Sequence, residues 1–142
     1  METTNKTNIT VESTVNAPVE KVWKFWTSPE HITKWNSPSL DWHTPKAEND
    51  LRKGGKLFAR MESKDGSMGF DFLGVYDEVT PNKRLAYTIA DGRKVDIEFA
   101  GNGNSTKVIE SFDAETENPL DFQRGGWQAI LNSFKNYTET SN

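Results

Sequence analysis

The last part of the chain carries a one-sided helical pattern that follows a long run of strand patterns. From position 127 onward the apolar side chains recur three and four residues apart, which is the spacing of a single helical face. They are Trp127, Ile130, Leu131, Phe134 and Tyr137. Residues 56–114 read instead as strands. A long amphipathic helix that follows consecutive antiparallel strands must pack against their sheet to bury its apolar face. Whether the space between them is a filled core or a ligand cavity is therefore the functional question.

Composition and charge restrict the class of protein. With 142 residues the chain suits one domain, and five Trp, eight Phe and three Tyr give it an aromatic core. It carries 17 basic and 21 acidic side chains without a basic run, which disfavours nucleic acid as a partner. The absence of cysteine excludes disulfides and thiolate chemistry. The first eight residues are polar and no segment reaches transmembrane length, so we expect a cytoplasmic monomer without a membrane span.

The pattern along the chain predicts a disordered tail over residues 1–8 and a single domain over 9–140. Residues 9–15 alternate as a half-buried strand. Two short helices follow, the second starting at Ser28-Pro29 and ending at Asn36-Ser37-Pro38. The segment after them is the least regular part of the sequence, with a possible short strand at Leu40-Asp41-Trp42-His43.

Five further strands are predicted from alternation and from turn residues at intervals of roughly 8–12 residues, which favours antiparallel pairing of neighbours. Their expected ranges are 56–63, 69–80, 84–90, 93–100 and 106–114. The resulting order is one strand, two helices, five or six strands and a long helix. We therefore predict an α+β fold.

This order, together with particular residues, resembles the helix-grip fold of the START-like (SRPBCC) superfamily and, within it, the family named after the heat-shock-protein-90 ATPase activator. The residues that carry the resemblance are Val15-Asn16-Ala17-Pro18 with Val22-Trp23, Trp35, Asp50-Leu51-Arg52 with Gly54-Gly55, Met61 with Asp65-Gly66, Phe72-Leu73-Gly74-Val75-Tyr76 with Val79 and Pro81, Arg84-Leu85 with Tyr87-Thr88, and Gly126-Trp127 with Leu131 and Tyr137. Each motif is weak alone, but their order over residues 9–140 is specific.

The resemblance implies a START/Bet v 1-like fold, in which a curved antiparallel sheet wraps around the C-terminal helix and encloses a mostly apolar cavity. Related proteins carry lipids, sterols, plant hormones or polyketides, and a few are enzymes. The chaperone activator itself has an additional N-terminal domain to which its main chaperone contact is attributed. Here only a short polar segment precedes the first strand, so we do not carry chaperone activation over from the family name.

Few residues could form a catalytic or metal site. Asp41 and His43 stand two apart and would point to one side of a strand, as an acid–base pair or half a metal site. The alternative, two exposed loop residues, carries more weight. His31 lies in the first turn of a short helix, where we expect it to face solvent. Without a His-x-x-x-His spacing, we predict no metal and no cofactor.

Two glycine pairs could be mistaken for phosphate-binding loops, but neither fits a phosphate-binding pattern. Gly54-Gly55 would let the chain turn sharply into the next strand. Gly125-Gly126 lies inside the final helix, where each glycine costs about 1 kcal/mol relative to alanine. That cost indicates a close approach of the sheet or a bend of the helix, which would shape the mouth of a cavity.

The aromatic side chains are the main candidates for a ligand site, the alternative being that they fill an ordinary core. The predicted ligand-binding residues are Trp26, Trp42, Phe58, Met61, Phe70, Phe72, Tyr76, Tyr87, Phe99, Trp127, Ile130, Leu131 and Phe134. In strand 56–63 the pattern allows either Leu57, Ala59 and Met61 or Phe58 and Arg60 to face inward. The charges expected near such a cavity are Arg60, Asp71, Arg84 and Glu98.

The sequence thus favours binding of a small hydrophobic or aromatic ligand (a lipid, sterol, polyketide or flavonoid-like compound) between the last helix and the sheet. The alternatives are an enzyme that acts on a cavity-bound substrate and a chaperone-linked interaction domain with a chaperone partner. Of these, binding without catalysis has the most support from the residues.

Overall fold

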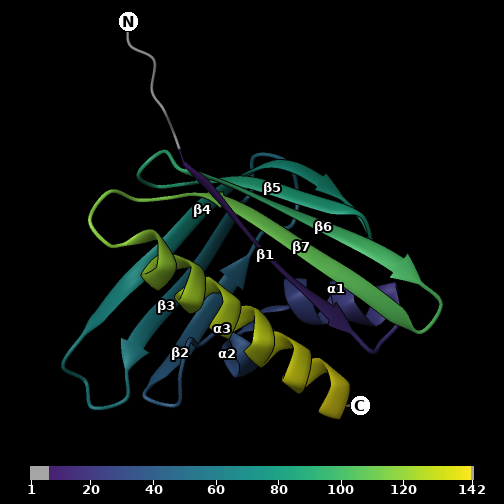
Figure 1. Ribbon diagram of the computed structural model, residues 1–142, viewed down its shortest axis with the longest axis horizontal. Coiled ribbons are helices and arrows are strands. Elements are labelled where there is room, and N and C mark those ends of the chain that lie inside the picture. The colour runs from purple at the N-terminus through teal and green to yellow at the C-terminus, as the bar shows by residue number, and fades with distance from the viewer. Residues whose placement is uncertain (1–6, 142) are drawn as a thin grey trace, which may run out of the picture.

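The computed structural model describes residues 7–141, which form one curved antiparallel sheet and three helices (Figure 1). The sheet has seven strands in the order β1-β7-β6-β5-β4-β3-β2, so β1 and β2 form its edges. The strands are β1 (Asn8–Val15), β2 (Trp42–Asn49), β3 (Lys56–Ser63), β4 (Gly69–Thr80), β5 (Arg84–Ile89), β6 (Lys94–Asn102) and β7 (Ser105–Asp113). Strands β2 to β7 follow one another as a meander, whereas β1 pairs with β7. The predicted α+β helix-grip architecture is confirmed.

The long helix α3 (Leu120–Thr140) lies along the concave side of the curled sheet, beside β1 (Figure 1). The predicted apolar face of α3 is confirmed. Leu131 and Phe134 are fully buried, and Trp127, Ile130 and Tyr137 pack against the core. The alternating strands supply the other side of that core, with inward side chains such as Ile97 and Phe112 fully buried. Helix and sheet therefore share one apolar layer, as the period of each pattern requires.

Long polar side chains of α3 tie the helix to the edge strand β1. Three of them donate hydrogen bonds to backbone carbonyl oxygens that have no strand partner on that side. The pairs, from side chain to carbonyl oxygen, are Arg124 to Thr10 at 3.1 Å, Gln128 to Glu12 at 3.2 Å and Lys135 to Thr14 at 2.8 Å. The carboxylate of Glu139 accepts a further bond from the backbone N–H of Asn16 at 2.7 Å. The helix is thus fixed along the whole length of β1.

The two short helices, α1 (Val19–Thr27) and α2 (Pro29–Trp35), close one end of the space between α3 and the sheet. Trp26 and Trp35 lie with ring centroids 4.8 Å apart, and both contact the ring of Phe134 in edge-on geometry. The indole N–H of Trp35 donates to the carbonyl oxygen of Phe25 at 2.9 Å, which satisfies its polar group. An aromatic cluster therefore forms the floor at this end.

Residues 42–49 form the edge strand β2, which begins within the possible short strand at 40–43 and extends to Asn49, through a segment that we expected to be irregular. Polar side chains dominate this strand, and Pro45 lies where the pairing register shifts between His43 and Lys46. Proline is tolerated at edges and bulges, so it did not exclude a strand. At the other end of the chain, residues 1–6 of the predicted tail lie outside the described residues, and Asn8 already belongs to β1.

Candidate functional site

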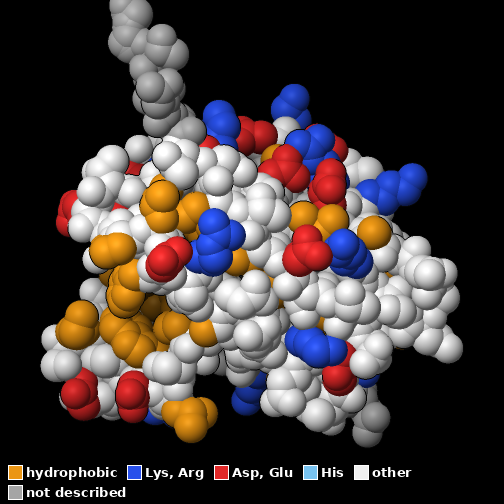
Figure 2. Space-filling model, viewed as in Figure 1, with side chains coloured by type: hydrophobic (Ala, Val, Ile, Leu, Met, Phe, Trp, Pro, Cys, Tyr) orange, Lys and Arg blue, Asp and Glu red, His pale blue; other side chains and the backbone are white. Residues whose placement is uncertain are grey.

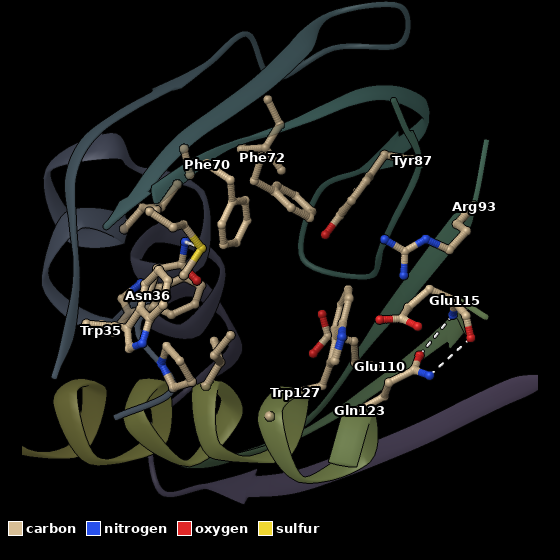
Figure 3. Close-up of a pocket in the computed structure, with 18 of the residues that line it drawn as sticks. Trp35, Asn36, Phe70, Phe72, Tyr87, Arg93, Glu110, Glu115, Gln123 and Trp127 are labelled. Carbon is tan, nitrogen blue, oxygen red and sulfur yellow. Dashed lines mark hydrogen bonds between the residues drawn. The ribbon is translucent and has the colours of Figure 1, made fainter. Parts of the chain in front are cut away.

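A pocket of about 450 Å³ lies between α3 and the concave face of the sheet (Figure 3). Its walls come from α1, α2, the meander strands and the first half of α3. Nine of the thirteen predicted ligand-binding residues line it: Trp26, Trp42, Met61, Phe70, Phe72, Tyr76, Tyr87, Trp127 and Ile130. Most lining side chains are apolar, and they come from segments far apart in the sequence. The curvature of the sheet brings them together.

Strand β3 settles the alternative that alternation left open. Leu57, Ala59 and Met61 line the pocket, so Phe58 and Arg60 point to the outer face of the sheet. The guanidinium of Arg60 there binds the carboxylates of Glu62 at 2.9 Å and Asp71 at 3.1 Å. Phe58 is consequently not part of the pocket.

Three other predicted residues, Phe99, Leu131 and Phe134, belong to the packed core rather than to the pocket lining. Phe134 and Phe99 contact the ring of Trp26 edge-on, with centroids 4.7 and 5.9 Å away. Trp26 therefore separates them from the open space. The apolar face of α3 is longer than the pocket, and Leu131 lies on the part of it that packs tightly.

Trp127 is held in place by the sheet. Its indole stacks on the ring of Phe112, with centroids 3.9 Å apart and planes 12° from parallel. Phe112 is fully buried in β7, so the stacked indole has a rigid support. Trp127 therefore presents the rest of its surface to the pocket in a fixed orientation (Figure 3).

Of the two explanations offered for the glycine pair in α3, a close approach of the sheet is wrong. A Cβ atom on Gly125 or Gly126 would meet no atom within 4 Å outside the helix's own nearby backbone. Gly126 lines the pocket, whereas Gly125 is exposed to solvent. Gly126 thus adds open space next to Trp127. By contrast, a Cβ on Gly74 would lie 2.8 Å from Cδ1 of Tyr87, so glycine at that position makes room for the tyrosine ring.

Glu110 is a buried acidic side chain that we did not predict in the pocket. It lies on β7, on the same inward face as Val108 and Phe112, and is 5% exposed. Burial raises its pKa from 4.5 to about 8, so the carboxyl is mostly protonated at neutral pH. An acidic residue at an inward position of an alternating strand was the signal that could have found it.

The charges that we did expect at the pocket lie elsewhere. Arg84 binds Asp96 and contacts Glu78 at 3.3 Å, and Arg60 binds Asp71, all as ion pairs among partly exposed side chains. None of these residues, nor Glu98, lines the pocket. The lining charges are instead Arg93, Glu110 and Glu115.

The mouth of the pocket is built from the segment between β7 and α3 and from the beginning of α3. The side chain of Gln123 is buried there: it accepts a bond from the backbone N–H of Glu115 at 2.9 Å and donates to the carbonyl oxygens of Glu115 and Asn118 (Figure 3). Phe122 lines the pocket and is 68% exposed. Figure 2 shows the surface hollowed where hydrophobic side chains gather beside the start of α3. The pocket is therefore open to solvent on this side.

Asp41 and His43 do not form the acid–base pair considered from the sequence. Asp41 lies in the turn before β2, where its carbonyl oxygen accepts a bond from the N–H of Lys64 at 2.7 Å. His43 Nε2 instead lies 3.8 Å from the carboxylate of Glu62. Within residues 7–141, no group of three or more acidic or histidine side chains is placed to hold a metal ion.

His31 does not simply face solvent, as we expected. Its ring stacks on Phe25 with centroids 4.0 Å apart, and Nδ1 is hydrogen-bonded to the hydroxyl of Tyr137 at 2.6 Å. Tyr137 is near the end of α3, so this contact fixes α2 to the helix away from the pocket.

In the part of the chain that the structure describes, no helix is both long and apolar enough to cross a bilayer.

The curled sheet, the long C-terminal helix and the pocket between them define a helix-grip domain of the START-like class. The chain belongs to the family described as Activator of Hsp90 ATPase homolog 1-like protein, which matches residues 16–139.

Solved structures support both the fold and the family. An AHSA1-like protein from Aeromonas hydrophila is 43% identical, with a TM-score of 0.88, over 94% of this chain and 92% of its own. A protein from Cytophaga hutchinsonii is 57% identical, with a TM-score of 0.81, over 93% and 92% of the two chains. A protein from Nitrosomonas europaea, 24% identical over 91% and 92%, shares the fold alone, with a TM-score of 0.78. The chain has no significant match among curated proteins.

Proposed function

We propose that the protein binds a small, mainly apolar molecule in the pocket between α3 and the sheet. The observation that supports this most directly is a space of about 450 Å³ whose walls are mostly apolar, with many aromatic side chains, and which opens to solvent at the start of α3. Ligand sites in proteins usually have roughly 300–1,000 Å³ and apolar walls with a few polar groups. A lipid, sterol, polyketide or flavonoid-like compound has the matching chemistry.

The aromatic walls favour a ligand with at least one flat ring. Trp127 is supported from behind by Phe112, and Phe72 and Tyr87 meet edge-on with centroids 6.1 Å apart. A flat ring can stack or pack edge-on against such side chains, and each aromatic pair adds about 0.5–1.5 kcal/mol beyond burial. Because the supports are packed in the core, these walls are already in position before a ligand arrives.

The test is a titration followed by NMR chemical shifts, using a panel of lipids, sterols and flavonoid-like compounds. We expect shifts at the pocket-lining residues and a loss of at least tenfold in affinity in Trp127→Ala, since burying an aromatic side chain contributes a few kcal/mol. Trp23→Ala is the matched control, because Trp23 packs on Phe99 without lining the pocket. Shifts confined to surface loops, or equal losses in the two variants, would contradict the proposal.

A chaperone-linked interaction is the second candidate, suggested by the family description. The observation in its favour is an apolar pair outside the pocket: Leu73 and Val75 on β4 are 41% and 42% exposed. A pull-down with the cell's own heat-shock chaperone tests it, with the double variant Leu73→Ser, Val75→Ser as the control. Recovery of chaperone by the native protein but not by the variant is the expected result, and no recovery would exclude this role.

A further inference from the structure

Two polar side chains at the inner wall of the pocket lack a hydrogen-bond partner. Glu110 and Tyr87 both line the pocket and are each 5% exposed (Figure 3). Within residues 7–141, the side-chain oxygen that is fully enclosed and has no hydrogen-bond partner is Thr138 Oγ1, whereas the Glu110 carboxyl and the Tyr87 hydroxyl border the open space of the pocket and bond to no neighbouring side chain. The neighbouring Tyr76 shows the ordinary situation, because its hydroxyl donates to Oδ1 of Asn49 at 2.7 Å. Polar groups that line a pocket and have no partner in the protein are the groups that can bond to a ligand there.

The strand neighbours of Glu110 provide no cation for its carboxylate, and Arg93, which also lines the pocket, pairs with Asp91 at 2.8 Å instead. Its cross-strand neighbours are Val11 on β1 and Ile97 on β6, and Val108 and Phe112 flank it along β7. Desolvation is the cause of the shift in its pKa, without a contribution from a charged neighbour. An isolated carboxyl in apolar surroundings stays protonated, because burying an unpaired charge is far more costly than burying the neutral acid. Glu110 therefore carries an O–H donor at neutral pH.

Tyr87 adds a second donor to the same space. Its hydroxyl belongs to a ring fixed by edge-on contacts with Phe72 and Tyr76, at centroid distances of 6.1 and 5.9 Å. In Figure 3 the hydroxyl points into the pocket, toward the side where Trp127 and Glu110 lie. Two donors that face one apolar space are complementary to a strong acceptor with two lone pairs, such as a carbonyl oxygen.

We propose that the pocket selects aryl carbonyl compounds, whose carbonyl oxygen accepts hydrogen bonds from the Tyr87 hydroxyl and the protonated Glu110 carboxyl at the inner wall. This inference rests on the proposed function and names the chemistry of its ligand. An apolar ligand without an acceptor leaves both donors unpaired when it displaces water from them, and that penalty is the source of selectivity. A cationic amine requires Glu110 to ionise first, which the apolar surroundings oppose.

Among the pocket-lining groups, Glu110 is the one whose ionisation falls in the range between pH 6 and 9. Burial raises the pKa of Tyr87 well above 10 and that of Tyr76 to about 12. At the mouth, hydrogen bonds from Asn118 lower the pKa of Glu115 below its usual 4.5. The elements β1, β6 and α3 present no charged side chain to Glu110 inside the pocket. Binding of an aryl carbonyl compound should therefore weaken as Glu110 ionises.

The test uses three probes with the same pair of rings: benzophenone, diphenylmethane and aminodiphenylmethane, titrated against the full chain by NMR and tryptophan fluorescence. At pH 6.5 we expect benzophenone to bind at least tenfold more tightly than diphenylmethane. Its affinity should fall about tenfold between pH 6.5 and 9, because about nine-tenths of Glu110 is ionised one pH unit above a pKa of about 8.

The variants separate the two donors. Glu110→Leu and Tyr87→Phe should each reduce the preference for benzophenone over diphenylmethane. Glu110→Gln keeps an N–H donor, so it should retain the preference and lose the pH dependence. Glu98→Leu, at an exposed position of β6, is the control for an added leucine.

Each outcome decides the question. Equal binding of benzophenone and diphenylmethane, or a preference that survives in both Glu110→Leu and Tyr87→Phe, would overturn the selectivity for carbonyl compounds while leaving the pocket as a binding site. Tighter binding of aminodiphenylmethane would instead assign an amine ligand and overturn the inference. Failure of all three probes to shift pocket residues would count against the proposed function itself.

Discussion

Replacing Glu110 by glutamine should change how the stability of the protein depends on pH. In the folded protein the pKa of Glu110 is raised to about 8, against 4.5 for the same side chain in an unfolded chain. Below pH 4.5 the carboxyl is protonated in both states and has no effect on the balance. Between pH 4.5 and 8 the unfolded chain releases the proton while the folded protein keeps it, so the free energy of unfolding falls as pH rises. Above pH 8 the loss is complete.

The size of the effect follows from the difference between the two pKa values. Each pKa unit corresponds to about 1.4 kcal/mol, so a rise from 4.5 to about 8 costs the native protein up to about 5 kcal/mol at pH 9. That is a large part of the roughly 5–15 kcal/mol by which a typical domain is stable. Glu110→Gln has a neutral amide of similar size and does not titrate. We therefore expect the variant to gain stability over the native protein steadily from pH 4.5 to 8.

The assay is urea unfolding followed by tryptophan fluorescence at several pH values from 4.5 to 9, for both proteins in parallel. Taking the difference between them at each pH removes the contributions of all other titrating groups. Glu98→Gln serves as the matched control, because Glu98 is exposed on β6 and its replacement should give a small difference that does not grow with pH. A difference between Glu110→Gln and the native protein that stays constant from pH 4.5 to 9 would refute the assignment of Glu110 as a buried neutral acid.

Two further predictions concern α3. Gly125→Ala and Gly126→Ala should each raise the free energy of unfolding by about 1 kcal/mol in urea titrations, since alanine is the better helix former and the space is open at both positions. In ligand titrations only Gly126→Ala should weaken binding, because Gly126 alone of the two lines the pocket, and equal losses would argue against that placement. Leu131→Ala should lower the free energy of unfolding by about 2–5 kcal/mol, because Leu131 is fully buried. Its ligand affinity, measured on folded protein, should change little, and a loss matching that of Trp127→Ala would place Leu131 in the site.

Most elements of the fold could be predicted because their sequence periods are unambiguous. The alternation in residues 69–80 gave the bounds of β4, and the helical spacing from Trp127 onward identified the buried face of α3. The extent of β2 beyond the possible short strand at 40–43 was not predicted, because this strand lies at an edge, has few buried side chains and contains Pro45 at a register shift. A pattern of apolar residues reveals a strand only where its side chains are buried. An edge strand with few buried side chains therefore leaves a weak pattern in the sequence.

The pocket was predictable to a lesser degree, because its position depends on how far the sheet curves from α3. Alternation placed Phe70 and Phe72 on the inner face, and both line the pocket. The helical spacing in α3 could not distinguish the part of the apolar face that borders open space from the part that packs tightly. For this reason Phe134 was included among the predicted ligand-binding residues. Glu110 was overlooked for a different reason. A hydrophobic pattern identifies the apolar side chains at inward positions of β7, whereas the informative residue is the acidic one among them.

The hydrogen bonds between α3 and β1 have a consequence for how the molecule behaves at high concentration. An open sheet presents unpaired backbone groups at its edges, and such edges invite strands from other molecules. Three backbone carbonyl oxygens of β1 accept hydrogen bonds from the side chains of Arg124, Gln128 and Lys135. An incoming strand would have to displace these side chains. At the opposite edge, Pro45 and the register shift in β2 interrupt the run of backbone groups. The sheet formed by residues 7–141 is thus protected against edge-to-edge aggregation by two unrelated devices, even though its pocket side remains open to solvent.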